Sequence, residues 1–323
     1  MESLEEYGGD HPLTAELAVA TAKRYLAEDR HRIRLEDLVK RETERLYEGL
    51  FLADSFPAGE ATSITETGFR SRVESYGRLT EVLLAVMIVG CYWDEKQRGQ
   101  LWASCLERIA NPPAVGGALP YVELRRYPAL LLMYGGGIAS ITGDRYETLT
   151  TLLYRARVRR QSEEYPLTLA LNTRSFPSGL GWMNSYLQLD RSPDQRVNFF
   201  RPFSENLYQA LRGPLHEMLP DEANYQKYFD RFEYLLGLVY VDQRKEHMPD
   251  YSGREGYGPI GLFGYRRQQP EGHRVLEEIA SEAESLREEW PPLRAGLFGY
   301  SYERYRVAKD AFNAFVEEET SGW

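Results

Sequence analysis

Apolar residues recur at helical spacing along most of the chain. Residues 13–29 place Leu13, Leu17 and Tyr25 near one stripe, and residues 35–53 repeat the pattern. Further helices are predicted at 65–93, 97–110, 127–142, 146–157, 204–218, 221–245, 270–289 and 301–319, with Thr65 or Thr67 and Asp221 suited to start two of them. Only residues 165–171 and 260–265 are strand candidates. The pattern predicts a mainly α fold, either an irregular multi-helix bundle or a short α-solenoid-like array of helical hairpins.

The longest apolar run is VLLAVMIVGCYW, at residues 82–93. Twelve residues span about 18 Å as a helix, whereas the hydrocarbon core of a bilayer is about 30 Å thick. We therefore expect a buried central helix and no membrane partner. Residues 1–10 are acidic and lack an apolar core, so we expect no secretory signal there. These features predict a soluble, cytoplasmic protein.

Three consecutive glycines, Gly135–Gly137, interrupt the apolar segment that precedes a turn at Gly143 and Asp144. After a strand, such glycines would suggest a dinucleotide-binding loop. The chain shows no alternation of strands and helices, and no acidic residue ends a second strand about 20 residues later. We favour a close crossing of two helices at these glycines, and we expect no cofactor.

Charge is distributed unevenly in this acidic chain. It has 49 acidic and 39 basic residues, a net charge of -10. Residues 1–160 contribute -2 and residues 161–323 contribute -8. We predict an N-terminal helical region, 1–160, and an acidic, tyrosine-rich helical region, 161–323, with one continuous domain as the alternative. A protein that binds duplex nucleic acid normally has a basic face, so nucleic acid is an unlikely partner.

Common catalytic motifs do not occur in the sequence. It has no GK dipeptide for a phosphate-binding loop, no HExxH metal motif and no GxSxG elbow. We therefore expect no metal site and lean against an enzyme. The alternative is an enzyme with its site in loop 175–185 or loop 247–265. In that case His247 with Asp250 or Glu255 is the best acid–base pair, because histidine titrates near neutrality.

Arginines form the sharpest basic cluster of the chain. The predicted hairpin would bring six of them to one end: Arg125, Arg126, Arg155, Arg157, Arg159 and Arg160. Such a group can hold a phosphate, an acidic protein face or a nucleic-acid backbone. The alternative is a solvated helix end, where cations favour the helix dipole.

The pentapeptide GLFGY occurs twice, at residues 261–265 and 296–300. Phe263, Tyr265, Phe298 and Tyr300 are therefore candidates for aromatic contact with a partner, since tyrosine is enriched at interfaces. The alternative is that the leucine and phenylalanine of each copy fill equivalent gaps in the core.

Together these features predict a helical protein-interaction or regulatory module that works with a protein partner or by self-association. Arginine outnumbers lysine 33 to 6, which suits a high-GC genome. We therefore expect a bacterial source, with a sensing or antiviral defence assembly as the setting. Phosphate or nucleic-acid backbone binding through the arginines at 155–160 is a further alternative.

Overall fold

The fold is mainly α, as predicted. We describe a computed structural model over residues 13–51, 63–95, 98–160, 163–189, 191–192, 195–248, 254, 256–269 and 274–321. The α-helices are α1 Ala15–Ala27, α2 Arg32–Phe51, α3 Glu66–Trp93, α4 Gly99–Ala110, α5 Leu119–Leu124, α6 Tyr127–Thr142, α7 Tyr146–Thr150, α8 Leu167–Ala170, α9 Leu180–Tyr186, α10 Pro202–Arg212, α11 Glu222–His247, α12 Leu262–Arg266, α13 Val275–Leu286, α14 Pro291–Arg294 and α15 Tyr302–Thr320. Strands β1 Arg157–Arg160 and β2 Glu163–Pro166 form an antiparallel hairpin.

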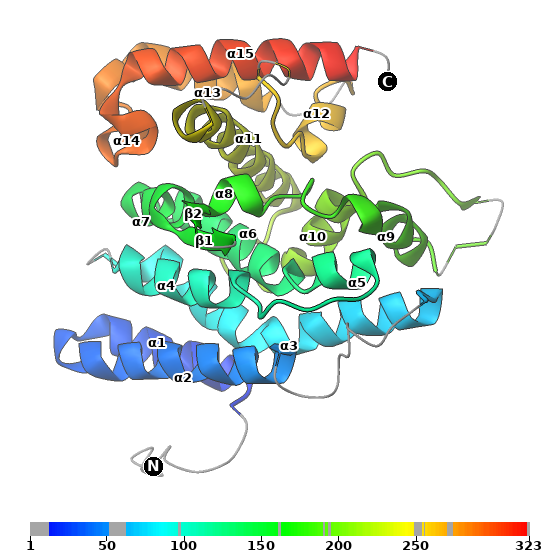
Figure 1. Cartoon of the computed structure of the whole chain (residues 1–323). Coiled ribbons are helices and arrows are strands. Elements are labelled where there is room, and N and C mark those ends of the chain that lie inside the picture. The colour runs from blue at the N-terminus through cyan, green and yellow to red at the C-terminus, as the bar shows by residue number, and fades with distance from the viewer. Residues whose placement is uncertain are drawn as a thin grey trace.

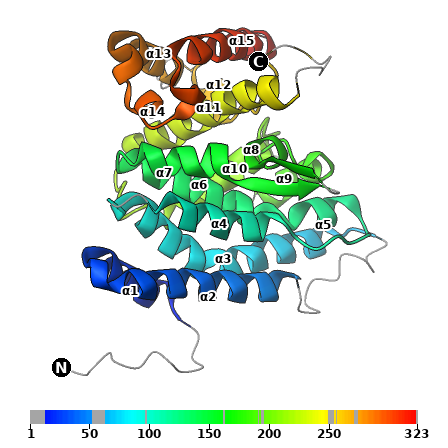
Figure 2. The same ribbon diagram turned by 60° about the vertical axis from the view of Figure 1, so that its left-hand side comes forward.

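The helices are stacked in nearly the order of the chain (Figures 1 and 2). Helices α1 and α2 form one end of the stack and pack on α3, which in turn packs on α6. Helix α6 contacts α11, and α11 contacts α13 and α15 at the other end. Helices α3, α6 and α11 are thus covered on two sides, so the apolar core continues from layer to layer.

Side chains cap several helices where the sequence predicts their starts. The hydroxyl of Thr65 accepts a hydrogen bond from Gly68 N, 3.0 Å away, at the start of α3. The carboxylate of Asp221 accepts one from Asn224 N at 2.9 Å, at the start of α11. Both predicted caps are confirmed, because each oxygen satisfies an amide that has no partner within its helix.

The triple glycine lies inside α6, at a crossing with two other helices. A Cβ on Gly135 would lie 2.6 Å from Leu84 of α3, and one on Gly137 would lie 2.0 Å from Phe232 of α11. The helix crossing is confirmed, and the dinucleotide-loop interpretation is wrong. Without side chains at these positions, α6 approaches α3 on one side and α11 on the other.

Helix α3 contains the long apolar run. Among the described residues it is the one helix that is long and apolar enough to cross a membrane. A core helix meets the same criteria, and α3 packs against α1, α2 and α6. Most of residues 82–93 are buried, which confirms the predicted core position.

Both strand predictions need correction. Residues 260–265 form no strand: Leu262–Arg266 is the helix α12. Of residues 165–171, only Tyr165 and Pro166 lie in β2, and Leu167–Ala170 is the helix α8. The partner strand β1 comes from the arginine run that was predicted to end a helix. These segments are short, and their tertiary packing overrides local preference.

Candidate protein-interaction face

Two segments without any charged residue meet on one side of the molecule. Residues 111–122 and 175–189 contain no Asp, Glu, Lys or Arg, although such residues make up 27% of the chain. The first segment leads into α5, and the second contains the 3₁₀ turn Pro177–Gly179 and α9. The turn packs against α5, and Ser178 N donates a hydrogen bond to Glu123 of α5 at 3.0 Å. Together they form one surface, which we call the uncharged face.

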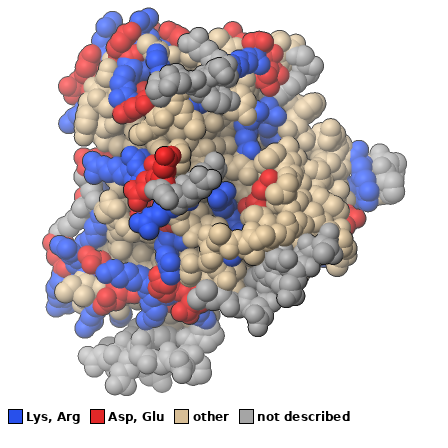
Figure 3. All heavy atoms as spheres, viewed as in Figure 1, with Lys and Arg blue, Asp and Glu red and all other residues tan. Residues whose placement is uncertain are grey.

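This face is also rich in exposed apolar side chains. Segments 111–126 and 171–201 make up 47 of the 323 residues but carry five of the twelve large hydrophobic side chains that are exposed in the described structure. Leu119 is 64% exposed and Phe200 52% exposed, and the other three are Val115, Leu180 and Val197. Figure 3 shows the corresponding broad area without charged atoms over α5 and α9. An exposed apolar patch of this kind is typical of a contact site for another protein.

Amide side chains of α9 and of the turn that follows it hold the loop before α10 against the face. Asn184 Oδ1 accepts a hydrogen bond from Phe199 N at 2.9 Å, and the Gln188 carbonyl accepts one from Val197 N at 2.5 Å. Phe200 then stacks on Tyr265 of α12, with ring centroids 6.2 Å apart and planes at 26°. The exposed Phe200–Tyr265 pair therefore extends the uncharged face as far as the first GLFGY copy.

Arginines border the uncharged face. Segments 111–126 and 171–201 together hold six arginines and three acidic residues, a balance of +3 in a chain of net charge -10. Arg174 lies over the ring of Tyr257 at 4.3 Å, and Arg191 lies over that of Phe199 at 5.4 Å. Burial and the nearby charge of Arg174 lower the pKa of Arg201. Figure 3 shows basic atoms at the upper and right-hand edges of the area.

A buried carboxylate fixes the elements behind the face. Glu233 of α11 is fully buried and accepts hydrogen bonds from the Ser204 hydroxyl of α10 and from Leu262 N of α12, the latter at 2.7 Å. Tyr134 of α6 donates a third, at 3.2 Å. Burial raises the pKa of Glu233 to about 7. The Glu233 side chain thus joins α6, α10 and α12. Helix α12 carries Tyr265, and α10 begins just after Phe200.

A second acid on α11, Asp230, pairs with Arg266 of α12 at 2.6 Å. Burial raises the pKa of Asp230 to about 6, against the lowering effect of Arg266. Its Oδ2 atom is buried and has no hydrogen-bond partner among the described residues. Both acids are buried where α11 meets α12, and each accepts a hydrogen bond from α12.

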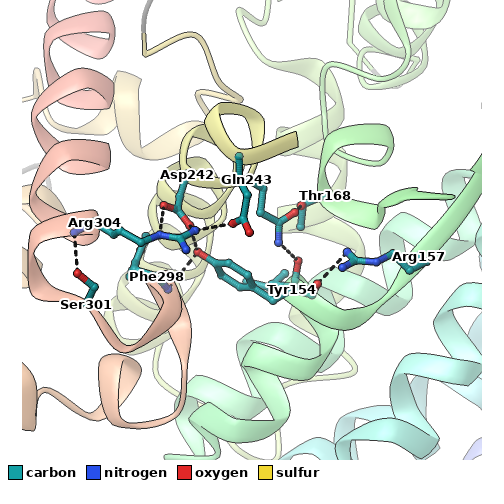
Figure 4. Close-up of polar contacts among 10 residues, drawn as sticks. Tyr154, Arg157, Thr168, Asp242, Gln243, Phe298, Ser301 and Arg304 are labelled. Carbon is teal, nitrogen blue, oxygen red and sulfur yellow. Dashed lines mark hydrogen bonds and ion pairs between the residues drawn. The ribbon is translucent and has the colours of Figure 1, made fainter. Parts of the chain in front are cut away.

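The second GLFGY copy rests on another polar network of α11 (Figure 4). The hydroxyl of Tyr154 donates to Asp242 at 2.6 Å and accepts a hydrogen bond from Phe298 N at 3.0 Å. Arg304 makes a bidentate pair with Asp242, at 3.0 and 2.7 Å. Burial and the neighbouring carboxylate of Asp242 raise the pKa of Tyr154. Beside it, Gln243 donates to the carbonyl of Leu153 at 2.8 Å.

The two GLFGY copies have different backbone conformations, but each buries its phenylalanine and exposes its tyrosine. The first enters helix α12, whereas Phe298, Gly299 and Tyr300 of the second have positive φ values of 55°, 60° and 62°. Phe263 and Phe298 are completely buried, so neither can contact a partner. Tyr265 is 42% exposed and Tyr300 65% exposed. Of the four aromatic candidates, only these tyrosines remain accessible.

The six predicted arginines differ in burial and in the groups that they contact. Arg125 is buried and donates to the carbonyl of Pro113 at 2.6 Å, while Arg126 is partly buried beside it. Strand pairing sets Arg159 opposite Glu164 and Arg160 opposite Glu163, and Arg159 contacts Glu164 at 3.3 Å. Arg157 donates to the carbonyl of Tyr154 at 2.9 Å, and Arg155 is exposed. The carboxylates of β2 therefore offset part of the positive charge that the arginine run gives to β1.

The loops proposed for an enzyme contain no assembled catalytic group in the described structure. His247 is exposed at the end of α11, whereas Asp250 and Glu255 lie outside the described residues. Loop 175–185 lacks charged residues altogether. The described residues form no cluster of His, Cys, Asp and Glu that could hold a metal ion.

Motifs and helical periodicity do not reveal the uncharged face, although the chain carries another signal for it. Loop 175–185 suggested a site for catalytic residues, and nothing in the sequence linked it to residues 111–122. The useful feature is the absence of charge over two runs of 12 and 15 residues. A run without charged residues can also be a buried loop. The two runs indicate a binding surface only because the tertiary structure places both on the same side of the molecule.

Comparison with protein-family models, with curated proteins and with solved structures finds no match for this chain.

Proposed function

We propose that this chain is a protein-binding module that holds its partner on the uncharged face. The observation that carries the proposal is the gathering of exposed apolar side chains on a surface built from two charge-free segments. The centres of protein interfaces are depleted in charged residues and enriched in aromatic ones. Leu119, Leu180 and Phe200 have the chemistry expected of such a centre, and the arginines have that of a rim.

The rigidity behind the face supports a binding role. Glu233 ties α10 to α12, and Asn184 and Gln188 hold the loop that carries Phe200. A surface that is already ordered loses less conformational entropy when a partner binds. The buried positions of Glu233 and Asp230 favour this structural role over acid–base catalysis. A regulatory role, a bacterial source and a defence setting stay predictions from sequence.

The proposal is tested by placing charge at the centre of the face. We expect Leu119→Asp with Leu180→Asp to abolish recovery of a specific partner in affinity purification, because a buried unpaired carboxylate is costly at an interface. Both leucines are exposed, so the free energy of unfolding of the isolated chain should change by no more than about 0.5 kcal/mol.

Ile33→Asp is the matched control. Ile33 is 71% exposed on α2, at the far end of the stack, so the control adds one carboxylate outside the face, against two in the face variant. It should leave partner recovery unchanged. Equal recovery by the face variant and wild type would contradict the proposal, as would equal loss in both variants.

A further inference from the structure

We infer that the partner presents an apolar surface flanked by acidic residues. This inference rests on the proposed function and specifies the chemistry of the same face. It follows from charge complementarity between the arginine border and the partner, and it argues against a symmetric contact with a second copy of this chain.

The charge around the face has the opposite sign to that of the whole molecule. Segments 111–126 and 171–201 together have a charge balance of +3, so the remainder of the chain has a balance of -13. Screening restricts the effect of exposed charges to about 8 Å at physiological salt. A partner that reaches this face therefore meets the local arginines, and the distant acidic residues contribute little to the contact.

Stacking on aromatic rings restrains two of the border arginines. Arg174 and Arg191 stack on Tyr257 and Phe199, and neither makes an ion pair within the described part of the chain. Arg159 and Arg212, in contrast, pair with Glu164 and Glu222. Stacking limits the movement of a guanidinium but leaves its charge, and the planar group suits two-pronged binding of a carboxylate.

Two other occupants fit these observations less well. A symmetric contact between two copies would place the same patch on both sides, and the border arginines of each copy would meet those of the other. A single-stranded nucleic acid needs successive aromatic platforms. The exposed aliphatic side chains Val115, Leu119 and Leu180 cannot stack on bases. They lie in the charge-free segments 111–122 and 175–189, which offer phosphates no charged contact.

Three synthetic helical peptides provide the test. All have the same leucine stripe, and the positions flanking the stripe are all Glu, all Gln or all Lys. Binding to the full chain is measured by fluorescence anisotropy at about 0.1 M and about 1 M NaCl, where the screening lengths are about 10 and 3 Å. We expect the Glu peptide to bind about tenfold more tightly than the Lys peptide at the lower salt, and the difference to shrink at the higher salt.

Charge reversal at the border should reverse this preference. We expect Arg191→Glu with Arg196→Glu to favour the Lys peptide, because both arginines are exposed beside the face. Arg34→Glu with Lys40→Glu is the control, since it makes the same change of charge on exposed positions of α2. The control should keep the preference for the Glu peptide.

The outcomes separate this inference from the proposed function. If all three peptides bind equally and Leu119→Asp abolishes binding, the face binds proteins but the acidic partner is wrong. Binding of none of the peptides also overturns the inference, while partner recovery still decides the proposed function. If the chain sediments as a dimer and Leu119→Asp converts it to a monomer, the occupant is a second copy. If oligo(dT) binds tightly and Phe200→Ala removes that binding, the occupant is a nucleic acid. Either result overturns the inference.

Discussion

The carboxylate of Glu233 occupies the space in which a side chain at position 261 would begin. An ideal Cβ built on Gly261 would lie 2.0 Å from Glu233 Oε2. Glycine at the start of the first GLFGY copy therefore lets Leu262 N reach the carboxylate. The sequence shows that this glycine is repeated in both copies, but it does not show that Glu233 Oε2 leaves no room for a side chain at position 261.

Gly261→Ala should destabilise the chain by about 1–3 kcal/mol, because the new methyl group displaces a buried, fully bonded carboxylate. Gly77→Ala is the control: Gly77 lies within α3, and a Cβ there meets nothing within 4 Å. Alanine at position 77 should stabilise the helix by about 0.5–1 kcal/mol. Urea unfolding of both variants measures the two effects, and equal changes would contradict this account.

Glu233 should also make stability depend on pH. Its pKa is raised from 4.5 to about 7 in the folded chain, so the folded state binds the proton more tightly than the unfolded state. Its contribution to stability is therefore complete below about pH 4.5 and is lost as pH rises through about 7, on the order of 3 kcal/mol in all. The groups around it are Asp230, Arg266, Arg201 and Tyr134.

Glu233→Gln should remove this part of the pH dependence, because the amide stays neutral. We expect the free energy of unfolding of the variant to fall less between about pH 5 and pH 8 than that of wild type, and urea unfolding at both pH values measures it. Glu284→Gln, on the exposed side of α13, is the control and should leave the profile unchanged. Identical profiles for wild type and Glu233→Gln would refute the assignment.

At the scale of elements, α11 organises the second half of the chain. Glu233 binds the first GLFGY copy, and Asp242 reaches the second through Tyr154. The two acids lie nine positions apart on one helix, so two short turns with different backbones depend on the same element. Amphipathic spacing predicted α11 and its cap, but helical periodicity alone does not show that buried acids on it hold loops.

Tyr154→Phe should cost about 1–3 kcal/mol, because Phe298 N loses its hydrogen-bond acceptor and Asp242 loses a donor. Tyr305→Phe is a matched control from the same region. Its hydroxyl is buried without a hydrogen-bond partner among the described residues, so its removal should be neutral or slightly stabilising. Thermal unfolding of both variants measures the difference, and a larger loss in Tyr305→Phe would contradict the assigned network.

At the scale of the whole molecule, contacts cross the predicted boundary between region 1–160 and region 161–323. That boundary falls between β1 and β2, which pair with each other. Tyr134 bonds Glu233, and Gln243 bonds the carbonyl of Leu153, so buried polar contacts also cross it. These contacts favour one continuous domain over two separate regions.

We therefore expect a single cooperative unfolding transition in calorimetry. Gly90→Ala should test the coupling, because a Cβ on Gly90 would lie 1.9 Å from Trp102 in the N-terminal layers. The variant should accelerate hydrogen exchange in α15 as well as in α3, because one unfolding event exposes both. Faster exchange confined to α3, or two resolved calorimetric transitions, would indicate separate domains.

The sequence by itself determined the mainly α fold, the caps of α3 and α11, the burial of residues 82–93 and the helix crossing at the triple glycine. These features depend on residues close together in the chain, or on the space that glycine leaves wherever it occurs. The tertiary structure decided the rest: Glu164 opposite Arg159, Glu233 beneath Leu262, and two charge-free segments on one surface. Each of those depends on which distant residues meet, and local periodicity carries no information about that.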